Sequence, residues 1–419
     1  MQHERNNRLA LFQRIAGEFG TPCYVYFEED IRSRARDLRS AFDNKFQISF
    51  AVKSNPNVGL LKCLRSVVER LDVSSIGEIA RALRAGWPPE RLSFTGPGKS
   101  ERELAAAVDH GVGEVVVESL DEAHALDGIL QGRRRWQRVL LRISPRTVPP
   151  GFGLTMSGKP SAFGVDEEAA DQALATLRGL SRLELVGFHI YSGSQCLKEQ
   201  AIVENYRIYI EVFRRLSQEH HLRPRMLVFG AGLGVAYHPE DRPLDLLTVS
   251  RAILPRLTDF QQEFSDAELL LETGRYLVAE AGVYLTKVTR VKESRGALIA
   301  ICDGGMHHNL AAAGHLGTVL RRNYRMLNVS GEQRDPRERG IYTIVGPLCT
   351  SLDTLGRDVD LARVEKGDVL AVLCSGAYGL TASPFYFISH PPPREILVGE
   401  RSHTCNEVTE WTPVSTPGD

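Results

Sequence analysis

The sequence of 419 residues lacks the features that mark several large classes of protein. Its seven cysteines are scattered and form no C-x-x-C pair, which argues against a disulfide framework and a structural zinc site. No apolar run approaches the ~18–20 residues of a transmembrane helix, and Met1–Arg5 enters charged sequence without the apolar core of a signal peptide. We therefore expect a cytoplasmic protein with free thiols and no metal centre.

An excess of positive charge is also missing. Lys and Arg number 51 against 52 Asp and Glu, so the net charge of −1 offers no basic field for nucleic acid or an anionic membrane. Internal repeats and long low-complexity segments are absent as well. What remains is the composition of an ordinary globular protein, with 42% hydrophobic and 25% charged residues. At roughly 150 residues per domain, the length favours about two to three domains.

Short apolar runs typical of strands alternate with amphipathic stretches through residues 28–275. The runs are Gln47–Val52, Arg70–Val73, Arg91–Thr95, Glu114–Glu118, Arg138–Ile143, Glu184–Ile190, Met226–Gly230 and Glu268–Glu272. Two of the stretches between them, Ile76–Leu83 and Val203–Leu216, carry apolar residues at the i, i+3, i+4 spacing of a helix. Strands that alternate with helices in this way predict an α/β fold, a (β/α)8 TIM barrel over residues 28–275.

The pattern changes after about residue 276. Strand-like runs follow one another without full helices between them, and Gly and Pro separate the runs. They are Val283–Val291, Ala297–Cys302, Ile341–Val345 and Val369–Leu373. Together with the early run Cys23–Phe27, they predict a second, all-β domain made of residues 1–27 and 276–419.

A lysine stands at the end of the first predicted barrel strand, where barrel enzymes place their reactive groups. Lys53 follows the apolar run Ile48–Val52, so partial desolvation favours its neutral, nucleophilic form. A lysine at a strand end can equally extend its charge to solvent. A Schiff-base role therefore needs a second signal, which is a place for the phosphate of a cofactor.

The segment Gly230–Gly234, with the sequence G-A-G-L-G, directly follows the seventh predicted strand. Glycines let backbone N–H groups approach a phosphate closely, and the loops after strands 7 and 8 are the usual phosphate site of a barrel. An ordinary turn is the alternative reading. Dinucleotide binding is disfavoured, because the glycines come late and no matching βαβ unit opens the chain.

Three more residues at strand ends suit a pyridine cofactor. Glu272 could accept a hydrogen bond from a protonated ring nitrogen, which makes the ring an electron sink. Arg275, in the next loop, could pair with a phosphate, and the flat ring of His189 could stack on the cofactor. The alternatives are a surface Glu–Arg pair and an ordinary core histidine.

Six segments resemble motifs of the fold type III pyridoxal-phosphate decarboxylases, a family that includes ornithine and diaminopimelate decarboxylases. They are Ala51–Asn55, Leu71–Glu78, His189–Gln195, Glu272–Arg275, Pro347–Cys349 and Gly376–Gly379. They occur in the family's order and the resemblance runs from about Thr21 to about Val398. In the fourth segment, Thr273 stands where the family has proline.

The resemblance implies pyridoxal 5′-phosphate (PLP) as the cofactor and assigns roles to individual residues. Lys53 holds PLP as a Schiff base, His189 stacks on its ring and Glu272 pairs with its ring nitrogen. The implied phosphate contacts are Ser192, Gly232, Arg275 and Tyr378, and Asp72, Arg142, Gly234 and Gly274 complete the cofactor site. A homodimer with shared active sites is also implied, in which Cys349 enters the partner's site and protonates the carbanion left by CO₂.

The segments implied to lie near the substrate, with Asp303, Thr350 and Tyr378, depart from the ornithine and diaminopimelate enzymes. Those enzymes carry an acidic residue directly after the reactive cysteine, whereas this chain has Thr350. Diaminopimelate decarboxylases also place an arginine shortly after the Asp-x-Gly-Met motif, and here none follows Asp303–Met306 before Arg321. The two segments most resemble the subgroup that decarboxylates conjugated amino acids, as in butirosin and citrate-based siderophore pathways.

Other functions stay open at this point. A diaminopimelate-type decarboxylase of a free diamino acid is one alternative. A PLP-dependent racemase is another, although racemases pair the ring nitrogen with arginine, so Glu272 favours decarboxylation. A non-catalytic relative is disfavoured by the presence of both Lys53 and Cys349. The basic cluster Arg133–Arg135 with Arg138 predicts either a solvated loop or a contact with a carrier protein or an anionic substrate.

Overall fold

A computed structural model describes residues 2–315, 322–399 and 404–409. Contacts divide this part of the chain into two compact units. The β-domain lies within residues 1–32, 236–242 and 277–412, and the barrel domain within 33–235 and 243–276. The short segment 236–242 therefore belongs to the β-domain, although barrel sequence flanks it on both sides.

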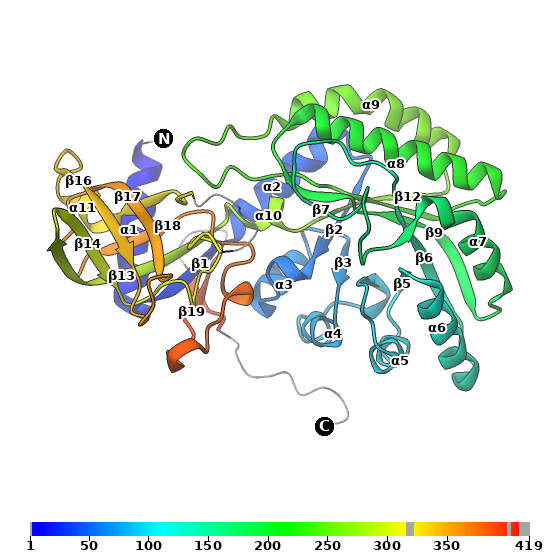
Figure 1. The fold of residues 1–419 in the computed structure, drawn as a ribbon, viewed down its shortest axis with the longest axis horizontal. Coiled ribbons are helices and arrows are strands. Elements are labelled where there is room, and N and C mark those ends of the chain that lie inside the picture. The colour runs from blue at the N-terminus through cyan, green and yellow to red at the C-terminus, as the bar shows by residue number, and fades with distance from the viewer. Residues whose placement is uncertain (1, 316–321, 400–403, 410–419) are drawn as a thin grey trace. The chain divides into compact units, whose positions relative to one another are not determined.

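In the described residues, eight parallel strands form the barrel, which confirms the predicted (β/α)8 fold (Figure 1). They are β2 (Gln47–Ala51), β3 (Arg70–Val73), β4 (Leu92–Phe94), β5 (Glu114–Val117), β6 (Gln137–Ser144), β9 (Leu183–Ile190), β11 (Met226–Gly230) and β12 (Glu268–Thr273). They pair in the order β5-β4-β3-β2-β12-β11-β9-β6, and the pairing of β5 with β6 closes the ring. Closure brings all eight C-terminal strand ends to one mouth.

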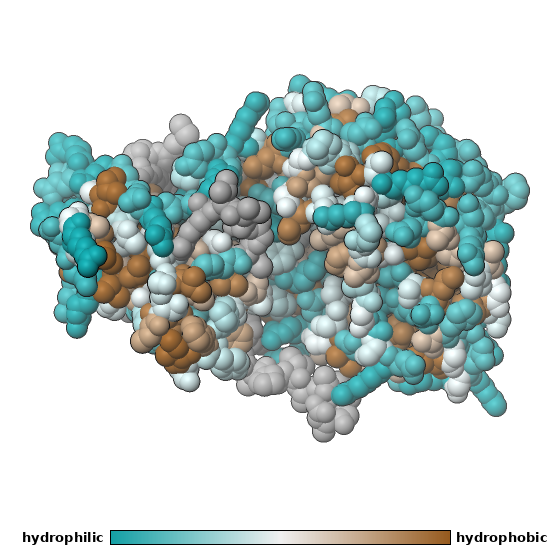
Figure 2. All heavy atoms as spheres, in the orientation of Figure 1, coloured by the Kyte–Doolittle hydropathy of each residue, from teal (hydrophilic) through white to brown (hydrophobic). Residues whose placement is uncertain are grey.

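Helices follow the barrel strands. They are α3 (Val58–Leu64), α4 (Ile76–Arg84), α5 (Glu101–His110), α6 (Leu120–Arg133), α7 (Ala170–Gly179), α8 (Glu199–Glu219) and α9 (Leu246–Glu263), and α2 (Glu28–Ala41) precedes β2. Serine caps begin three of them, and the Ser100 and Glu103 pair at α5 forms a complete capping box. The faces that α8 and α9 show in Figure 2 are mostly hydrophilic, as expected for helices whose apolar side packs on a barrel.

The β-domain is built on a mixed sheet with the order β17-β16-β14-β13-β1-β19-β20, while β18 pairs with β13 and β15. Its strands are β1 (Cys23–Phe27), β13 (Gly282–Ser294), β14 (Ala297–Cys302), β15 (Met326–Asn328), β16 (Arg339–Val345), β17 (Thr354–Ala362), β18 (Val369–Val372), β19 (Arg394–Val398) and β20 (Cys405–Glu407). The early strand β1 joins it by pairing with β13 and β19.

The β-domain is mostly β rather than all-β, because helix α1 (Gln2–Phe19) belongs to it. Leu9, Phe12 and Ile15 are buried in one cluster with Val25 of β1 and Val283 of β13. Their spacing of three residues puts them on one face of a helix. That face covers apolar surface of the sheet, so a helix at the N-terminus could have been predicted from this stripe.

Two further features concern membrane-spanning helices and the cysteines. In the described part of the chain, no helix combines the length and the apolar character needed to cross a membrane. All seven cysteines lie in described residues and are free thiols, of which Cys349 is exposed.

Candidate active site

Three residues predicted from strand ends, Lys53, His189 and Glu272, meet Asp72, which the family resemblance implied, at the mouth of the barrel. Lys53 lies in the short 3-10 turn Val52–Ser54 directly after β2, which pairs with β3 and β12. Lys53 Nζ donates to Asp72 Oδ2 at 2.9 Å and lies 3.9 Å from Glu272 Oε1. His189 Nε2 lies 2.8 Å from Glu272 Oε2. The lysine, imidazole and two carboxylates therefore form one charged cluster.

The two carboxylates of this cluster have different electrostatics. Burial alone would raise the pKa of Glu272, but His189 and Lys53 outweigh it and hold that pKa below its usual range. Burial raises the pKa of Asp72, and the neighbouring charge of Glu272 adds to the rise while Lys53 opposes it. A buried carboxylate that stays ionised, as Glu272 does, can hold a proton on a basic ring nitrogen.

Arg142, also predicted in the cofactor site, is engaged by a residue that sequence reasoning missed. Its guanidinium donates to Glu118 Oε1 at 2.9 Å and stacks 4.9 Å from the ring centre of Phe163. Glu118 also accepts backbone N–H groups from Gly96 and Gly164. It thereby fixes the loops after β4 and β6, and the predicted contact of Arg142 with the cofactor stays a prediction.

The glycine segment and the Ser192 turn form one hydrogen-bonded structure. The Cys196 N–H, in β10 (Gly193–Cys196), donates to Gly232 O at 3.0 Å, and the Gly234 N–H donates back to Cys196 O at 2.9 Å. Gly232 has φ +66°, and a Cβ there would lie 2.7 Å from the Phe152 ring. The positive φ and the close approach of Phe152, in β7 (Phe152–Thr155), therefore require glycine at this position.

Gly274 and Arg275 follow the last barrel strand. A Cβ on Gly274 would lie 2.6 Å from Ser54 Oγ and 3.0 Å from Ala51 O. The glycine thus lets the chain after Glu272 pass against the turn that carries Lys53. Arg275 begins the short helix α10 (Arg275–Val278).

The residues at the barrel mouth fit PLP. In the described chain, Asp72 Oδ1, His189 Nδ1 and Ser192 Oγ are buried without a hydrogen-bond partner, and such atoms in a native protein are normally satisfied by water or a ligand. Lys53 supplies an amine, Glu272 a carboxylate for a ring nitrogen, and the glycine loop backbone N–H groups for a phosphate. PLP, when bound, supplies an electron sink for the bonds at a substrate's α-carbon.

The substrate segments of the β-domain are held together by Asp353, which sequence reasoning also missed. Asp353 is 2% exposed; its Oδ1 accepts the Met306 N–H at 2.6 Å and its Oδ2 accepts the Leu348 N–H at 2.8 Å. A Cβ on Gly305 or Gly346 would collide with this carboxylate. One buried acid therefore joins the Asp303–Met306 and Pro347–Cys349 segments. In the sequence, the position of this acid four residues after Cys349 could have marked it as part of the site.

Asp303 is engaged inside the same domain. Its Oδ2 accepts from the Thr21 hydroxyl at 2.6 Å, and its Oδ1 accepts from the Thr286 hydroxyl and the Lys287 N–H, each at 2.8 Å. Cys349 is exposed, Thr350 and Tyr378 are half-buried, and Tyr378 has φ +52°. The predicted roles of these residues toward cofactor and substrate stay predictions.

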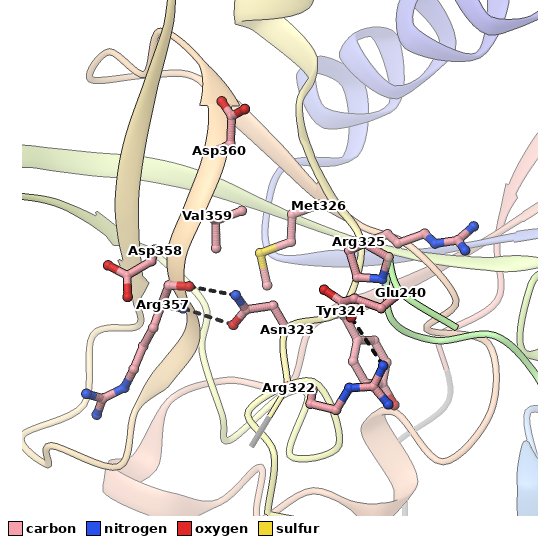
Figure 3. Close-up of a pocket in the computed structure, with 11 residues that line it drawn as sticks. Glu240, Arg322, Asn323, Tyr324, Arg325, Met326, Arg357, Asp358, Val359 and Asp360 are labelled. Carbon is pink, nitrogen blue, oxygen red and sulfur yellow. Dashed lines mark hydrogen bonds and ion pairs between the residues drawn. The ribbon is translucent and has the colours of Figure 1, made fainter. Parts of the chain in front are cut away.

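A cavity of about 780 Å³ lies in the β-domain, between β17 and residues 322–326 (Figure 3). Arg322 pairs there with Glu240 and Asp241, and the Asn323 side chain bonds both backbone groups of Arg357. No residue of the Lys53 cluster lines this cavity. It is therefore separate from the predicted cofactor site.

The basic cluster Arg133–Arg135 with Arg138 lies at the opposite end of the barrel from Lys53. It precedes or opens β6 at that strand's N-terminal end, whereas Lys53 follows the C-terminal end of β2. Arg133 pairs with exposed Asp109, Arg135 donates to Val108 O, and Arg138 lies 3.2 Å from buried Glu114. These contacts favour the solvated-loop interpretation.

Comparison with known proteins gives the family. Residues 28–279 match the model described as pyridoxal-dependent decarboxylase, pyridoxal binding domain. The chain is 36% identical to L-glutamyl-[BtrI acyl-carrier protein] decarboxylase of Niallia circulans, over 91% of this chain and 90% of the relative. It is 30% identical to 2-[(L-alanin-3-ylcarbamoyl)methyl]-2-hydroxybutanedioate decarboxylase of Staphylococcus aureus, over 90% and 93%.

Diaminopimelate decarboxylases are also similar. The enzyme of Aquifex aeolicus is 32% identical over 92% of this chain and 88% of its own. The solved structure of the Helicobacter pylori enzyme complexed with L-lysine has a TM-score of 0.83 at 27% identity and covers 95% of both chains. With the match over most of the chain and a mouth of the barrel that fits PLP, this protein belongs to the pyridoxal-dependent decarboxylases.

Proposed function

We propose that this decarboxylase releases CO₂ from the α-carbon of an L-amino-acid unit that is conjugated to a carrier protein or to citrate. Such a reaction would serve antibiotic or siderophore biosynthesis. The observation that carries the proposal is the lack of a free charged group, in the two substrate segments of the β-domain, for the distal end of a diamino acid.

In those two segments, the acid expected after Cys349 is replaced and the carboxylates nearby are already hydrogen-bonded. Thr350 replaces the acid expected after Cys349, and its hydroxyl accepts the Leu352 N–H. The nearby carboxylates, Asp303 and Asp353, are each engaged by donors of their own domain. Residues 307–315 contain no arginine for a distal carboxylate, and Arg321 lies outside the described residues. A free ammonium or carboxylate at the far end of the substrate would thus lack a partner here.

The relatives support both the proposal and its main alternative. One relative is named for a glutamyl group on an acyl-carrier protein, and another for an L-alanin-3-yl group linked through a carbamoyl group to a hydroxybutanedioate. Diaminopimelate decarboxylases at 32% identity favour a free diamino acid as the alternative substrate. Thr350 and the engagement of Asp303 and Asp353 by donors of their own domain support a conjugated substrate over a free diamino acid.

In the proposed reaction each residue of the site has one task. Lys53 would hold PLP covalently, His189 would support its ring and Glu272 would keep the ring nitrogen protonated. When bound, PLP would supply an electron sink for the electron pair left at Cα when the bond from Cα to the carboxylate breaks and CO₂ leaves. Cys349 then donates its thiol proton to Cα, which completes the amine product.

A comparison of substrates tests the function. We expect kcat/KM for L-lysine, L-ornithine and meso-diaminopimelate to be lower by roughly a hundredfold than for a citrate-linked or carrier-linked L-amino acid, because a buried charge without its partner costs a few kcal/mol. Released CO₂ is measured for each compound under identical conditions. A free diamino acid as the best substrate would contradict this reading of Thr350.

We also propose a homodimer whose two active sites each take Lys53 from one chain and Cys349 from the other. Lys53→Ala and Cys349→Ala proteins are each expected to be inactive. Random reassortment of equal amounts should restore activity to about a quarter of the sites, the binomial expectation for a two-fold dimer. Activity is measured after subunit exchange, which differently tagged chains can verify. Exchange without recovery would count against the shared site.

A cytoplasmic location is a further part of the proposal. It rests on the seven free thiols, one of them the exposed Cys349 that the reaction requires. Cytoplasmic reductants keep such thiols reduced.

A further inference from the structure

Helix α8 carries two buried tyrosines that each hydrogen-bond one of the two loops at the predicted phosphate site. The Tyr209 hydroxyl oxygen accepts the backbone N–H of Ser192 at 2.9 Å. The Tyr206 hydroxyl donates to the backbone carbonyl of Ala231, inside the glycine segment, also at 2.9 Å. Residues three apart lie on one helix face, so a single face of α8 contacts both loops.

The two loops are also joined to each other. In addition to the Cys196–Gly232 and Cys196–Gly234 bonds, the Gln195 side chain donates to Val235 O at 2.6 Å and accepts the Val235 N–H at 3.0 Å. Each loop is thus hydrogen-bonded both to the other loop and to α8. Moving either loop would therefore break its hydrogen bonds to the other loop and to α8.

Aromatic packing fixes the position of both hydroxyls. Tyr206 and Tyr209 are fully buried, and their ring centres lie 6.3 and 6.0 Å from that of Phe229 on β11. Burial raises the pKa of each phenol, so both hydroxyls stay protonated at neutral pH. Tyr209 can therefore accept from the Ser192 N–H without becoming a buried charge beside a phosphate.

The side-chain hydroxyl of Ser192 is suited to bind a ligand group at this point. Its side chain is completely buried, yet its Oγ has no hydrogen-bond partner among the described residues. The backbone N–H of the same residue is already taken by Tyr209. The hydroxyl is therefore the group of Ser192 that remains for a phosphate oxygen, and Tyr209 determines where it stands.

We propose that Tyr206 and Tyr209 are positioning residues for the cofactor phosphate, acting through Ala231 and Ser192 without touching PLP. This inference rests on PLP as the cofactor and does not depend on the substrate. Removing the Tyr209 hydroxyl leaves the Ser192 N–H buried and unpaired, which the loop can relieve only by moving. Groups of the cofactor other than the phosphate are bound by other residues.

The test compares PLP with pyridoxal, which lacks the phosphate. Both are titrated into the cofactor-free full-length protein, with binding followed by absorbance. For Tyr209→Phe we expect Kd for PLP to rise about tenfold, the equivalent of about 1.4 kcal/mol, while Kd for pyridoxal stays unchanged. Inorganic phosphate should also compete with PLP less well in this variant. Tyr206→Phe should show the same split between PLP and pyridoxal.

The matched control is Tyr342→Phe, which removes a buried hydroxyl that accepts the Val364 N–H in the β-domain. It should lower the thermal stability as the α8 variants do, yet leave the ratio of the two Kd values unchanged. A merely structural role of the α8 tyrosines predicts equal losses for PLP and pyridoxal. Equal losses, or unchanged PLP affinity in both α8 variants, overturn the proposal. If Tyr209→Phe does not fold, Tyr206→Phe decides the matter alone.

Discussion

Replacing Lys53 by alanine is expected to reduce turnover below detection and to remove the visible absorption of bound cofactor. Lys53 Nζ lies within 2.9 Å of Asp72 and 3.9 Å of Glu272, and its amine is the covalent attachment for PLP in the proposed reaction. No other residue of the cluster offers an amine. Turnover is measured by CO₂ release and attachment by the absorption spectrum.

Lys62→Ala provides the control for this substitution. Lys62 is an exposed residue of α3, away from the strand ends, and its loss should change neither spectrum nor rate. Borohydride reduction of the wild-type protein followed by peptide mass analysis should locate the adduct on Lys53. An adduct on a different lysine would refute the assignment.

Glu272→Gln is expected to retain the cofactor and its absorption but to lower kcat by roughly 10²–10³-fold, the typical cost of losing one preorganised electrostatic contact. The carboxylate is 3% exposed and its pKa is depressed by His189 and Lys53 despite burial. An amide of the same shape cannot hold the ring nitrogen in its protonated form, so electron withdrawal weakens. Spectra and kcat are measured on the same preparation.

A second glutamate on the same strand controls for side effects of the change. Glu268 begins β12 at the opposite end of the barrel and is exposed, so Glu268→Gln should leave turnover as it is. If Glu272→Gln turns over near the wild-type rate, the carboxylate does not act on the ring nitrogen. Loss of the cofactor itself would likewise show that Glu272 serves binding rather than rate.

Much of the barrel could be predicted because its strands are buried on both faces. Such strands appear as continuous apolar runs, and two of them, Arg70–Val73 and Met226–Gly230, have the observed bounds. Elements without that signal were missed. The hairpin of β7 (Phe152–Thr155) with β10 is largely exposed on its β7 side, and α1 shows only a narrow stripe of buried apolar residues among charged and polar ones.

The candidate active site could likewise be predicted only in part. Lys53, His189 and Glu272 could be found from the sequence, because each ends a recognisable strand and barrels place chemistry there. Their pairing could not, since it depends on the strand order that sets β2 between β3 and β12.

The sequence by itself determined the alternation of strands and helices, the reactive residues at strand ends and the missing acid after Cys349. Only the tertiary structure decided which polar groups are engaged. Glu118 with Arg142, Asp353 with Met306, and Tyr209 with Ser192 are separated by 17 to 47 residues in the chain. Hydrogen bonds act over about 3 Å, so these partnerships exist only once barrel closure and sheet pairing bring distant segments into contact.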